Sequence, residues 1–229
     1  EMFRNYTDHI VGYPVDQDGL QVEALAEDLA RRQREGLPLP KLLYTIASFQ
    51  NPTGATLAPA RRRRLLELAE AFDFLILEDD AYGELSFGAP PVPLKAMDGT
   101  GRVIYLGSLS KIVAPGIRIG WVVAAPELVA AMQLFKKDLD HPLGWGIAAQ
   151  YLAGVDLEAR VAGLRKAYRD RRDLMLESLR REMPDGVSWT EPGGGFFIWI
   201  RVPGVDTVKL LPRALAAGVA YVPGKYFYF

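Results

Sequence analysis

The sequence predicts an α/β fold, in which helices flank a mostly parallel sheet and a smaller α+β unit follows at the C-terminal end. Three observations predict it. Short apolar runs recur through the first half of the chain, a helical pattern separates the second run from the third, and the connections between them are short. A strand, a helix and a second strand joined in this way form a βαβ unit, whose two strands are parallel.

The apolar runs of the first half predict five strands. We expect them at residues 10–15, 42–49, 74–77, 103–106 and 119–124. Most of these runs are continuous and do not alternate with polar residues. Continuous runs are typical of strands that are buried on both faces of a sheet.

The segment between the second and third strands predicts the crossover helix. Leu65, Leu68, Ala69 and Phe72 recur at the spacing of one helix face, and Pro59 stands where a helix would start. Four arginines, at positions 61 to 64, lie within this helix. Four consecutive residues spread around most of a helix, so we expect them to form a solvated face and not a nucleic-acid stripe.

The second half predicts a helical unit with fewer strands. We expect helices at residues 126–139, 145–153 and 157–183, strands at 196–202 and 219–222, and a helical stretch between those strands. The longest helix carries an apolar stripe and ends at Pro184-Asp185-Gly186, which suits an amphipathic helix on a domain surface better than a coiled coil. We predict two domains, residues 1–152 and residues 153–229.

Composition excludes several classes of function. The 229 residues carry 27 basic and 28 acidic side chains. This even balance does not indicate a basic surface that would bind nucleic acid or an anionic membrane. The absence of cysteine excludes disulfides and thiolate nucleophiles, and two histidines are too few for a histidine-rich metal site. No apolar run approaches the roughly 20 residues of a membrane helix, and we expect no signal peptide. We expect a cytoplasmic protein.

Polar motifs stand at the ends of three predicted parallel strands. They are Gln50-Asn51-Pro52-Thr53-Gly54, Glu78-Asp79-Asp80-Ala81-Tyr82 and Gly107-Ser108-Leu109-Ser110-Lys111. In open α/β sheets, ligands bind beyond the carboxyl ends of the strands. We therefore expect an amide, a carboxylate with a phenol, and two hydroxyls with an amine to meet at one edge of the sheet.

The chemistry that these groups can share is narrow. Three motifs are absent: the phosphate-binding G-x-x-x-x-G-K-[ST], a G-x-G-x-x-G after a strand, and the G-x-S-x-G of a serine hydrolase. What remains is an amine nucleophile at Lys111, close to hydroxyls and to Arg118. The sequence therefore predicts a lysine that forms a Schiff base.

Four motifs in order resemble those of the class I/II aminotransferases of fold type I, which depend on pyridoxal 5'-phosphate. They are Asn51-Pro52-Thr53-Gly54, Asp79-x-Ala81-Tyr82, Ser108-x-Ser110-Lys111 and Pro115-Gly116-x-Arg118. The resemblance runs from Ile10 onward. Within the family, the residues around Asp79 and Lys111 are most similar to those of the 2-aminoadipate and kynurenine aminotransferase branch.

The resemblance implies a cofactor site built from Asn51, Asp79, Tyr82, Ser108, Ser110, Lys111 and Arg118. Lys111, the catalytic residue, would bind the cofactor covalently, and Asp79 would face the pyridine nitrogen so that the ring acts as an electron sink. Asn51 and Tyr82 would hydrogen-bond the ring oxygen. The phosphate would be held by the two serines and by the planar guanidinium of Arg118.

The implied reaction moves an amino group from an amino acid to a 2-oxo acid in two half-reactions. The lysine released by the incoming amine would carry the proton between the substrate and the cofactor. The family resemblance also implies a homodimer, with 2-oxoglutarate as the natural acceptor. We expect no nucleic-acid or membrane partner.

Two other functions remain open on the sequence. Some transcriptional regulators carry an aminotransferase-like sensor domain, although Asn51 and Ala81-Tyr82 favour the enzyme. Another pyridoxal-phosphate reaction, such as β-elimination, would use the same cofactor-binding motifs. The three glycines at 193 to 195 are either a turn into a strand or, by resemblance, a segment close to the substrate.

Several parts of the family pattern have no counterpart here. These parts are the N-terminal arm, a glycine-containing phosphate loop, the aromatic residue that stacks on the cofactor, and an arginine for the substrate carboxylate beyond Val222-Pro223-Gly224. We therefore expect the fold to be incomplete at the N-terminus and the chain to be a fragment or to have further segments.

Overall fold

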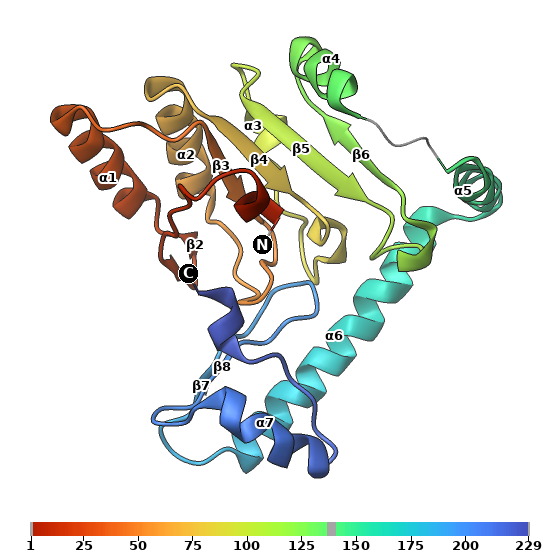
Figure 1. Ribbon diagram of the computed structural model, residues 1–229. Helices are drawn as coiled ribbons and strands as arrows, with labels where there is room; N and C mark the ends of the chain where they lie inside the picture. The colour runs from red at the N-terminus through yellow and green to blue at the C-terminus, as the bar shows by residue number, and fades with distance from the viewer. Residues whose placement is uncertain (1, 137–140, 229) are drawn as a thin grey trace.

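A four-stranded sheet organises the first half of the chain. The computed structural model describes residues 2–136 and 141–228 (Figure 1). The strands β3 (Leu42–Thr45), β4 (Leu75–Asp79), β5 (Val103–Ser108) and β6 (Gly120–Val123) lie side by side in that order. The first three are parallel and β6 is antiparallel to β5, so the prediction of a mostly parallel sheet is confirmed.

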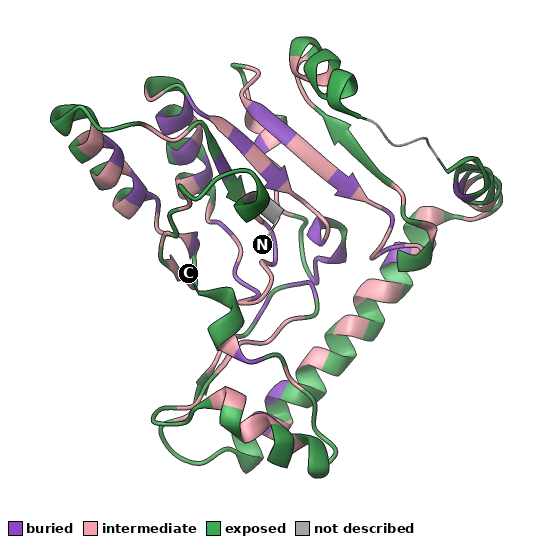
Figure 2. Ribbon diagram, viewed as in Figure 1, coloured by how far each residue is buried: buried purple, intermediate pink, exposed green. Residues whose placement is uncertain are grey.

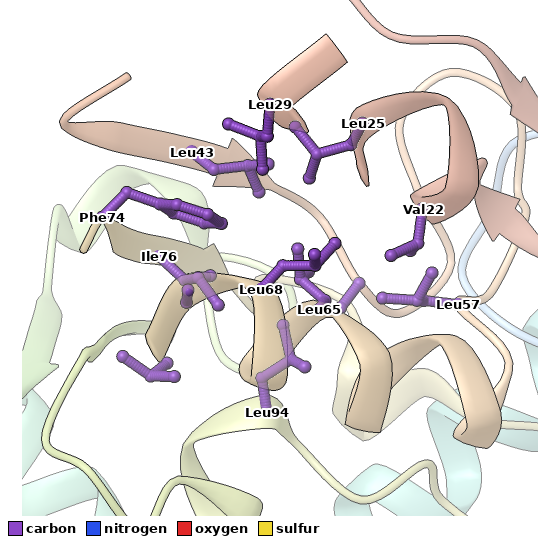
Figure 3. Packing of buried hydrophobic residues seen from close by; sticks show 13 residues of the cluster. Val22, Leu25, Leu29, Leu43, Leu57, Leu65, Leu68, Phe74, Ile76 and Leu94 are labelled. Atoms are coloured by element: carbon purple, nitrogen blue, oxygen red, sulfur yellow. The ribbon is translucent and has the colours of Figure 1, made fainter. Parts of the chain in front are cut away.

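Helices cover one face of this sheet. They are α1 (Val22–Glu35), α2 (Pro59–Ala71) and the short α3 (Leu94–Met97). Figure 3 shows Leu25 and Leu29 of α1, Leu65 of α2 and Ile76 of β4 in one cluster of buried apolar side chains. All four of these side chains are fully buried, so this layer forms the main hydrophobic core.

Helix α1 was not predicted from the sequence. Its buried residues Val22, Leu25 and Leu29 follow helical spacing, but Gln21 at the N-cap makes no capping hydrogen bond with its side chain. The end is better marked, because Gly36 adopts the left-handed conformation that stops a helix. The missed signal was therefore the spacing of the three apolar residues.

The other face of the sheet is open over much of its area (Figure 2). All four residues of β6 are exposed, and Tyr44 on β3 is 45% exposed. The expectation that the strands are buried on both faces is therefore wrong for the described chain. The continuous apolar runs supply one row of side chains to the helix-covered face and a second row to the open face, because side chains alternate along a strand.

Two further predicted strands are wrong. Residues 10–14 are irregular, and a small hairpin follows them, formed by β1 (Val15–Asp16) and β2 (Gly19–Leu20). Residues 219–222 form no strand. The strand predicted at 196–202 is reduced to β8 (Ile200–Arg201), which pairs with β7 (Ser188–Trp189).

The remaining helices follow the predictions closely. They are α4 (Pro126–Phe135), α5 (Pro142–Gly154), α6 (Leu157–Glu182) and α7 (Thr207–Ala216), with short 3-10 turns η1 (Met2–Asn5), η2 (Gly83–Leu85), η3 (Pro115–Ile117) and η4 (Gly224–Phe227). The predicted helix 126–139 ends at Phe135, and residues 137–139 lie outside the described residues. Among residues 2–136 and 141–228, no helix has the length and apolar character needed to cross a membrane.

A second hydrophobic cluster joins the two halves of the chain. Leu85, Leu109 and Ile112 from the sheet side pack with Ala148 of α5 and Val161 of α6. The cluster crosses the predicted border between residues 152 and 153. We retain that border as a proposal, and the packing means that two such domains would be in firm contact.

An ion pair is buried beneath the carboxyl end of β4. Glu78 is fully buried and accepts hydrogen bonds from the backbone N–H groups of Leu94 (2.7 Å) and Lys95 (2.9 Å). Arg62 lies 3.8 Å from it. Burial raises the pKa of Glu78 and lowers the pKa of Arg62, and their mutual attraction opposes both shifts.

Arg62 corrects the expectation that the arginines at 61 to 64 form a solvated face. Its side chain is 3% exposed and donates to the carbonyl oxygens of Ala47, Leu57 and Val92. The guanidinium thereby ties α2 to the segment after β3. A run of charged residues on a helix therefore does not predict the burial of each residue in it, because one position of the run can face the core.

We predict that Glu78→Gln lowers the free energy of unfolding by about 1–3 kcal/mol, because the amide cannot accept both N–H groups and Arg62 loses its counter-charge. Glu67→Gln is the matched control, since Glu67 pairs with Arg64 on the exposed side of α2, the helix that also carries Arg62. It should cost about 0.5 kcal/mol or less. Urea unfolding measures both values, and equal losses would contradict a special role for Glu78.

Candidate functional site

Asp79 is the last residue of β4 and lies on the open face of the sheet. Its Oδ2 accepts a hydrogen bond from the hydroxyl of Tyr44 at 2.8 Å. Tyr44 pairs in register with Leu77, two residues before Asp79, so the strand period places both side chains on one face. Burial and the nearby carboxylate raise the pKa of Tyr44, so its hydroxyl stays a donor.

Asn51 and Tyr82 meet beside this carboxylate. The side chain of Asn51 hydrogen-bonds the phenol of Tyr82, which is 7% exposed. Burial and the neighbouring Asp79 raise the pKa of Tyr82, and the hydrogen bond from Asn51 lowers it in part. The loop after β3 and the loop after β4 therefore present a polar pair at the carboxyl edge, as the sequence predicts.

Lys111 lies in the turn that follows β5. The flanking Leu109 and Ile112 are buried in the second cluster, and the N–H of Val113 donates to the carbonyl of Leu109 at 2.8 Å. The amine Nζ is 5.9 Å from the centre of the Tyr82 ring and 5.6 Å from that of Phe196. Packing of its two neighbours thus leaves Lys111 directed toward aromatic rings at the edge of the sheet.

Ser108 and Ser110 form one small hydrogen-bonded group. Ser108 Oγ accepts from the N–H of Ser110 at 3.1 Å and donates to the carbonyl of Ile119 at 3.4 Å. Arg118 follows η3 and adopts a left-handed backbone, with φ of 54°. A non-glycine residue in this conformation costs about 1–2 kcal/mol, and such residues cluster at functional sites.

The structure brings together six of the seven predicted site residues in three local groups. They are the pair Asn51 and Tyr82 next to Asp79, the amine of Lys111 beside the Tyr82 ring, and the serine pair. Arg118 is exposed, and within the described part of the chain its guanidinium makes no hydrogen bond or ion pair with the others. Its backbone conformation is the feature that distinguishes it here.

Asp80 lies on the opposite side of the sheet from Asp79. Its Oδ2 accepts from the hydroxyl of Tyr105 at 3.0 Å, and Tyr105 pairs in register with the buried Glu78. Its other oxygen is buried and has no hydrogen-bond partner among the described residues. Burial raises the pKa of Asp80, and the hydrogen bond from Tyr105 opposes that rise.

The three glycines at 193 to 195 permit a close approach between segments of this chain. A Cβ at Gly194 would collide with the Phe49 ring and with the carbonyl of Leu85, and Gly195 has a φ of 67°. The N–H of Gly195 donates to that same carbonyl at 3.0 Å. Glycine here lets the loop before Phe196 lie against the loops after β3 and β4.

Tyr44 and Phe196 were not predicted from the sequence as parts of this site. Tyr44 alternates with the buried Leu43, so the period of the strand could have assigned it to the face of Asp79. For Phe196 the available signal was the run of three glycines before it, which by resemblance lies close to the substrate. Its ring packs edge-on against Tyr82 at 5.3 Å and is tilted against Tyr168 at 5.4 Å.

Comparison with known proteins relates the chain to one family of enzymes. The sequence model of the family "Aminotransferase class I and II" matches residues 1–229. The "Aromatic-amino-acid aminotransferase 1" of Thermococcus litoralis is 45% identical over 100% of this chain and 56% of its own length. The chain therefore spans a little over half the length of this relative.

A solved structure and a regulator extend the comparison. The kynurenine aminotransferase of Pyrococcus horikoshii, crystallised with PMP, has a TM-score of 0.90 at 48% identity, over 95% of this chain and 55% of that one. This likeness confirms the predicted fold. The "HTH-type transcriptional regulator TauR" of Rhodobacter capsulatus is 40% identical over 90% of this chain and 44% of its own length.

We predict that Tyr44→Phe weakens binding of pyridoxal phosphate about ten-fold, because Asp79 loses a hydrogen bond to its charged oxygen. Tyr105→Phe is the matched control, since it removes the equivalent bond to Asp80 on the other face. That variant should lose about 1–3 kcal/mol of stability and keep its affinity within about two-fold. Absorbance titration and thermal melting separate the two effects, and equal affinity losses would contradict the assignment of faces.

Proposed function

Because the chain belongs to the class I and II aminotransferases, we propose that it forms part of an enzyme that transfers an amino group from an amino acid to a 2-oxo acid, with pyridoxal 5'-phosphate as cofactor. The observation that carries the proposal is the convergence of Lys111, Asp79 and the Asn51–Tyr82 pair at one sheet edge. These groups come from three separate strand ends, which is where ligands of α/β sheets bind.

The donor set fits this cofactor group by group. The carboxylate of Asp79 suits a pyridine N–H, the phenol of Tyr82 with the amide of Asn51 suits the ring oxygen, and the amine of Lys111 suits the aldehyde. The serine pair and Arg118 offer hydroxyls and a guanidinium of the kind that bind phosphate. Among the three acidic residues at the end of β4, Asp79 is the one on the open face, where a ligand can reach it.

When bound, pyridoxal phosphate supplies an aldehyde for condensation with an amine and a ring that accepts electrons. The chain supplies orientation and proton transfer. Lys111 Nζ is the group that would hold the cofactor at its aldehyde, and the same amine would move a proton to and from the substrate. Tyr44 holds the Asp79 carboxylate in place, and Asn51 holds the phenol of Tyr82.

We propose an aromatic amino acid as the donor. The Lys111 amine lies beside the rings of Tyr82 and Phe196, and the rings of Tyr168 and Phe197 pack against these two. Phe196 is 40% exposed, so its ring can pack against an aromatic substrate in an offset or edge-on arrangement. The names of the two aminotransferases compared above, one aromatic and one for kynurenine, support this choice.

We also propose that the protein acts as a homodimer. Along α5, Leu143, Trp145 and Ile147 are each more than half exposed, and apolar residues of this size are typical of an interface. The cytoplasmic location expected from the sequence stays a prediction.

A cofactor-sensing domain of a transcriptional regulator is the second candidate, and the identity to TauR favours it. The Asn51–Tyr82 pair favours the enzyme, because both groups act on the cofactor ring during chemistry. A sensor would bind pyridoxal phosphate through the same lysine but would not convert it when an amino acid is added. The same experiment therefore distinguishes the two.

We predict that the purified protein forms an absorbance band with pyridoxal phosphate and that the band is lost in Lys111→Ala. Lys166→Ala is the control, since this lysine is 78% exposed and pairs with Asp170 on α6. An aromatic amino acid should then convert the band to that of the pyridoxamine form. A lysine-dependent band that no amino acid changes would favour the sensor, and a band that survives Lys111→Ala would refute the site.

A further inference from the structure

Helix α6 lies along the loops that form the site, and several of its arginines bind backbone carbonyl groups of those loops (Figure 1). Arg160 donates to the carbonyls of Ile112 and Val113, Arg165 to that of Glu84, and Arg172 to that of Pro192. An arginine that bonds to carbonyl oxygens fixes the path of the chain, because its planar fork has a set direction.

Arg160 binds the turn that carries Lys111. Its Nε is 3.0 Å from the carbonyl oxygen of Ile112, and its Nη2 is 3.2 Å from that of Val113. These are the first and second residues after Lys111. The guanidinium also lies over the Tyr151 ring of α5, 5.8 Å from its centre, so its own position is set by packing.

Two further arginines bind the neighbouring loops. Arg165 Nε lies 2.6 Å from the carbonyl of Glu84, two residues beyond Tyr82. Arg172 Nη1 lies 2.7 Å from the carbonyl of Pro192, before the glycines that lead to Phe196. A single rigid helix therefore contacts the segments that carry the amine and the two rings next to it.

We propose that Arg160 is a positioning residue for Lys111, through which α6 fixes the amine relative to the cofactor ring. This inference rests on the proposed function. The turn itself is already anchored by the buried side chains of Leu109 and Ile112, so the guanidinium is not needed to fold it. Two hydrogen bonds to successive carbonyls instead define the orientation of the turn, and thereby the direction of the Lys111 side chain.

The test compares two ligands that differ in one group. Pyridoxal phosphate has the aldehyde that reacts with Lys111, whereas pyridoxamine phosphate has none and binds through the other contacts alone. Arg160→Gln should weaken pyridoxal phosphate binding about ten-fold, the equivalent of two net hydrogen bonds, and pyridoxamine phosphate binding by about two-fold or less. Arg160→Lys should recover only part of the loss, because an ammonium group cannot present the planar fork.

Arg171→Gln is the matched control, because Arg171 is an exposed arginine of the same helix. It should change neither affinity. Borohydride trapping followed by mass spectrometry gives a second readout, in which Arg160→Gln slows the covalent labelling of Lys111 at saturating cofactor. Thermal melting of the apoprotein reports whether the fold is intact.

Equal loss of affinity for the two ligands would overturn the proposal, because it would show a general structural effect. Unchanged labelling of Lys111 in Arg160→Gln would overturn it as well. If the wild-type protein forms no Lys111-dependent band, the proposed function fails and this inference falls with it. If the wild-type band forms and Arg160→Gln matches Arg171→Gln, the inference alone fails.

Discussion

The alternation of side chains at the end of β4 is the constraint on which the rest of the site depends. Three consecutive acidic residues occupy this strand end, and the two-residue period sends them to different surroundings. Glu78 and Asp80 point to the helix-covered face, where Arg62 and Tyr105 meet them, and Asp79 points to the open face. One carboxylate is thereby available to a ligand while its neighbours are committed to the fold.

The buried carboxylates explain why α2 and α3 are arranged as they are. A charge in the core is costly unless it is paired and hydrogen-bonded, and Glu78 finds its donors in the N–H groups at the start of α3 and its counter-charge on α2. The same groups hold the end of β4 in register with its neighbours. A one-residue slip would turn Asp79 inward and bring Glu78 to the open face, so the helix layer protects the geometry of the site.

The sequence predicted the fold class and the sheet edge that the candidate site residues share, but not the contacts made across the chain. Residues at the ends of parallel strands share one edge whatever their exact packing, so the motifs at Asn51, Asp79 and Lys111 were sufficient to bring these groups together. The partners in contacts between distant segments could not be read from local sequence patterns. Phe196, from the second half of the chain, lies beside the amine of Lys111. Arg62 faces the core, although it belongs to a run of arginines that is typical of an exposed helix face. Helix α1 was not predicted, although its buried Val22, Leu25 and Leu29 recur at helical spacing.

Lys111 lies where the two halves of the chain meet, and this location has a consequence for ligand binding. Tyr82 comes from the loop after β4, Phe196 comes from the segment after β7, and the turn of Lys111 packs on α5 and α6. A ligand at the amine therefore contacts elements from both halves and stabilises their association, because binding to the folded state alone shifts the folding equilibrium. Conversely, any loosening of α6 moves the amine and its aromatic neighbours together. Cofactor affinity and the packing of α6 therefore both depend on how the Lys111 turn and the aromatic rings beside it are positioned.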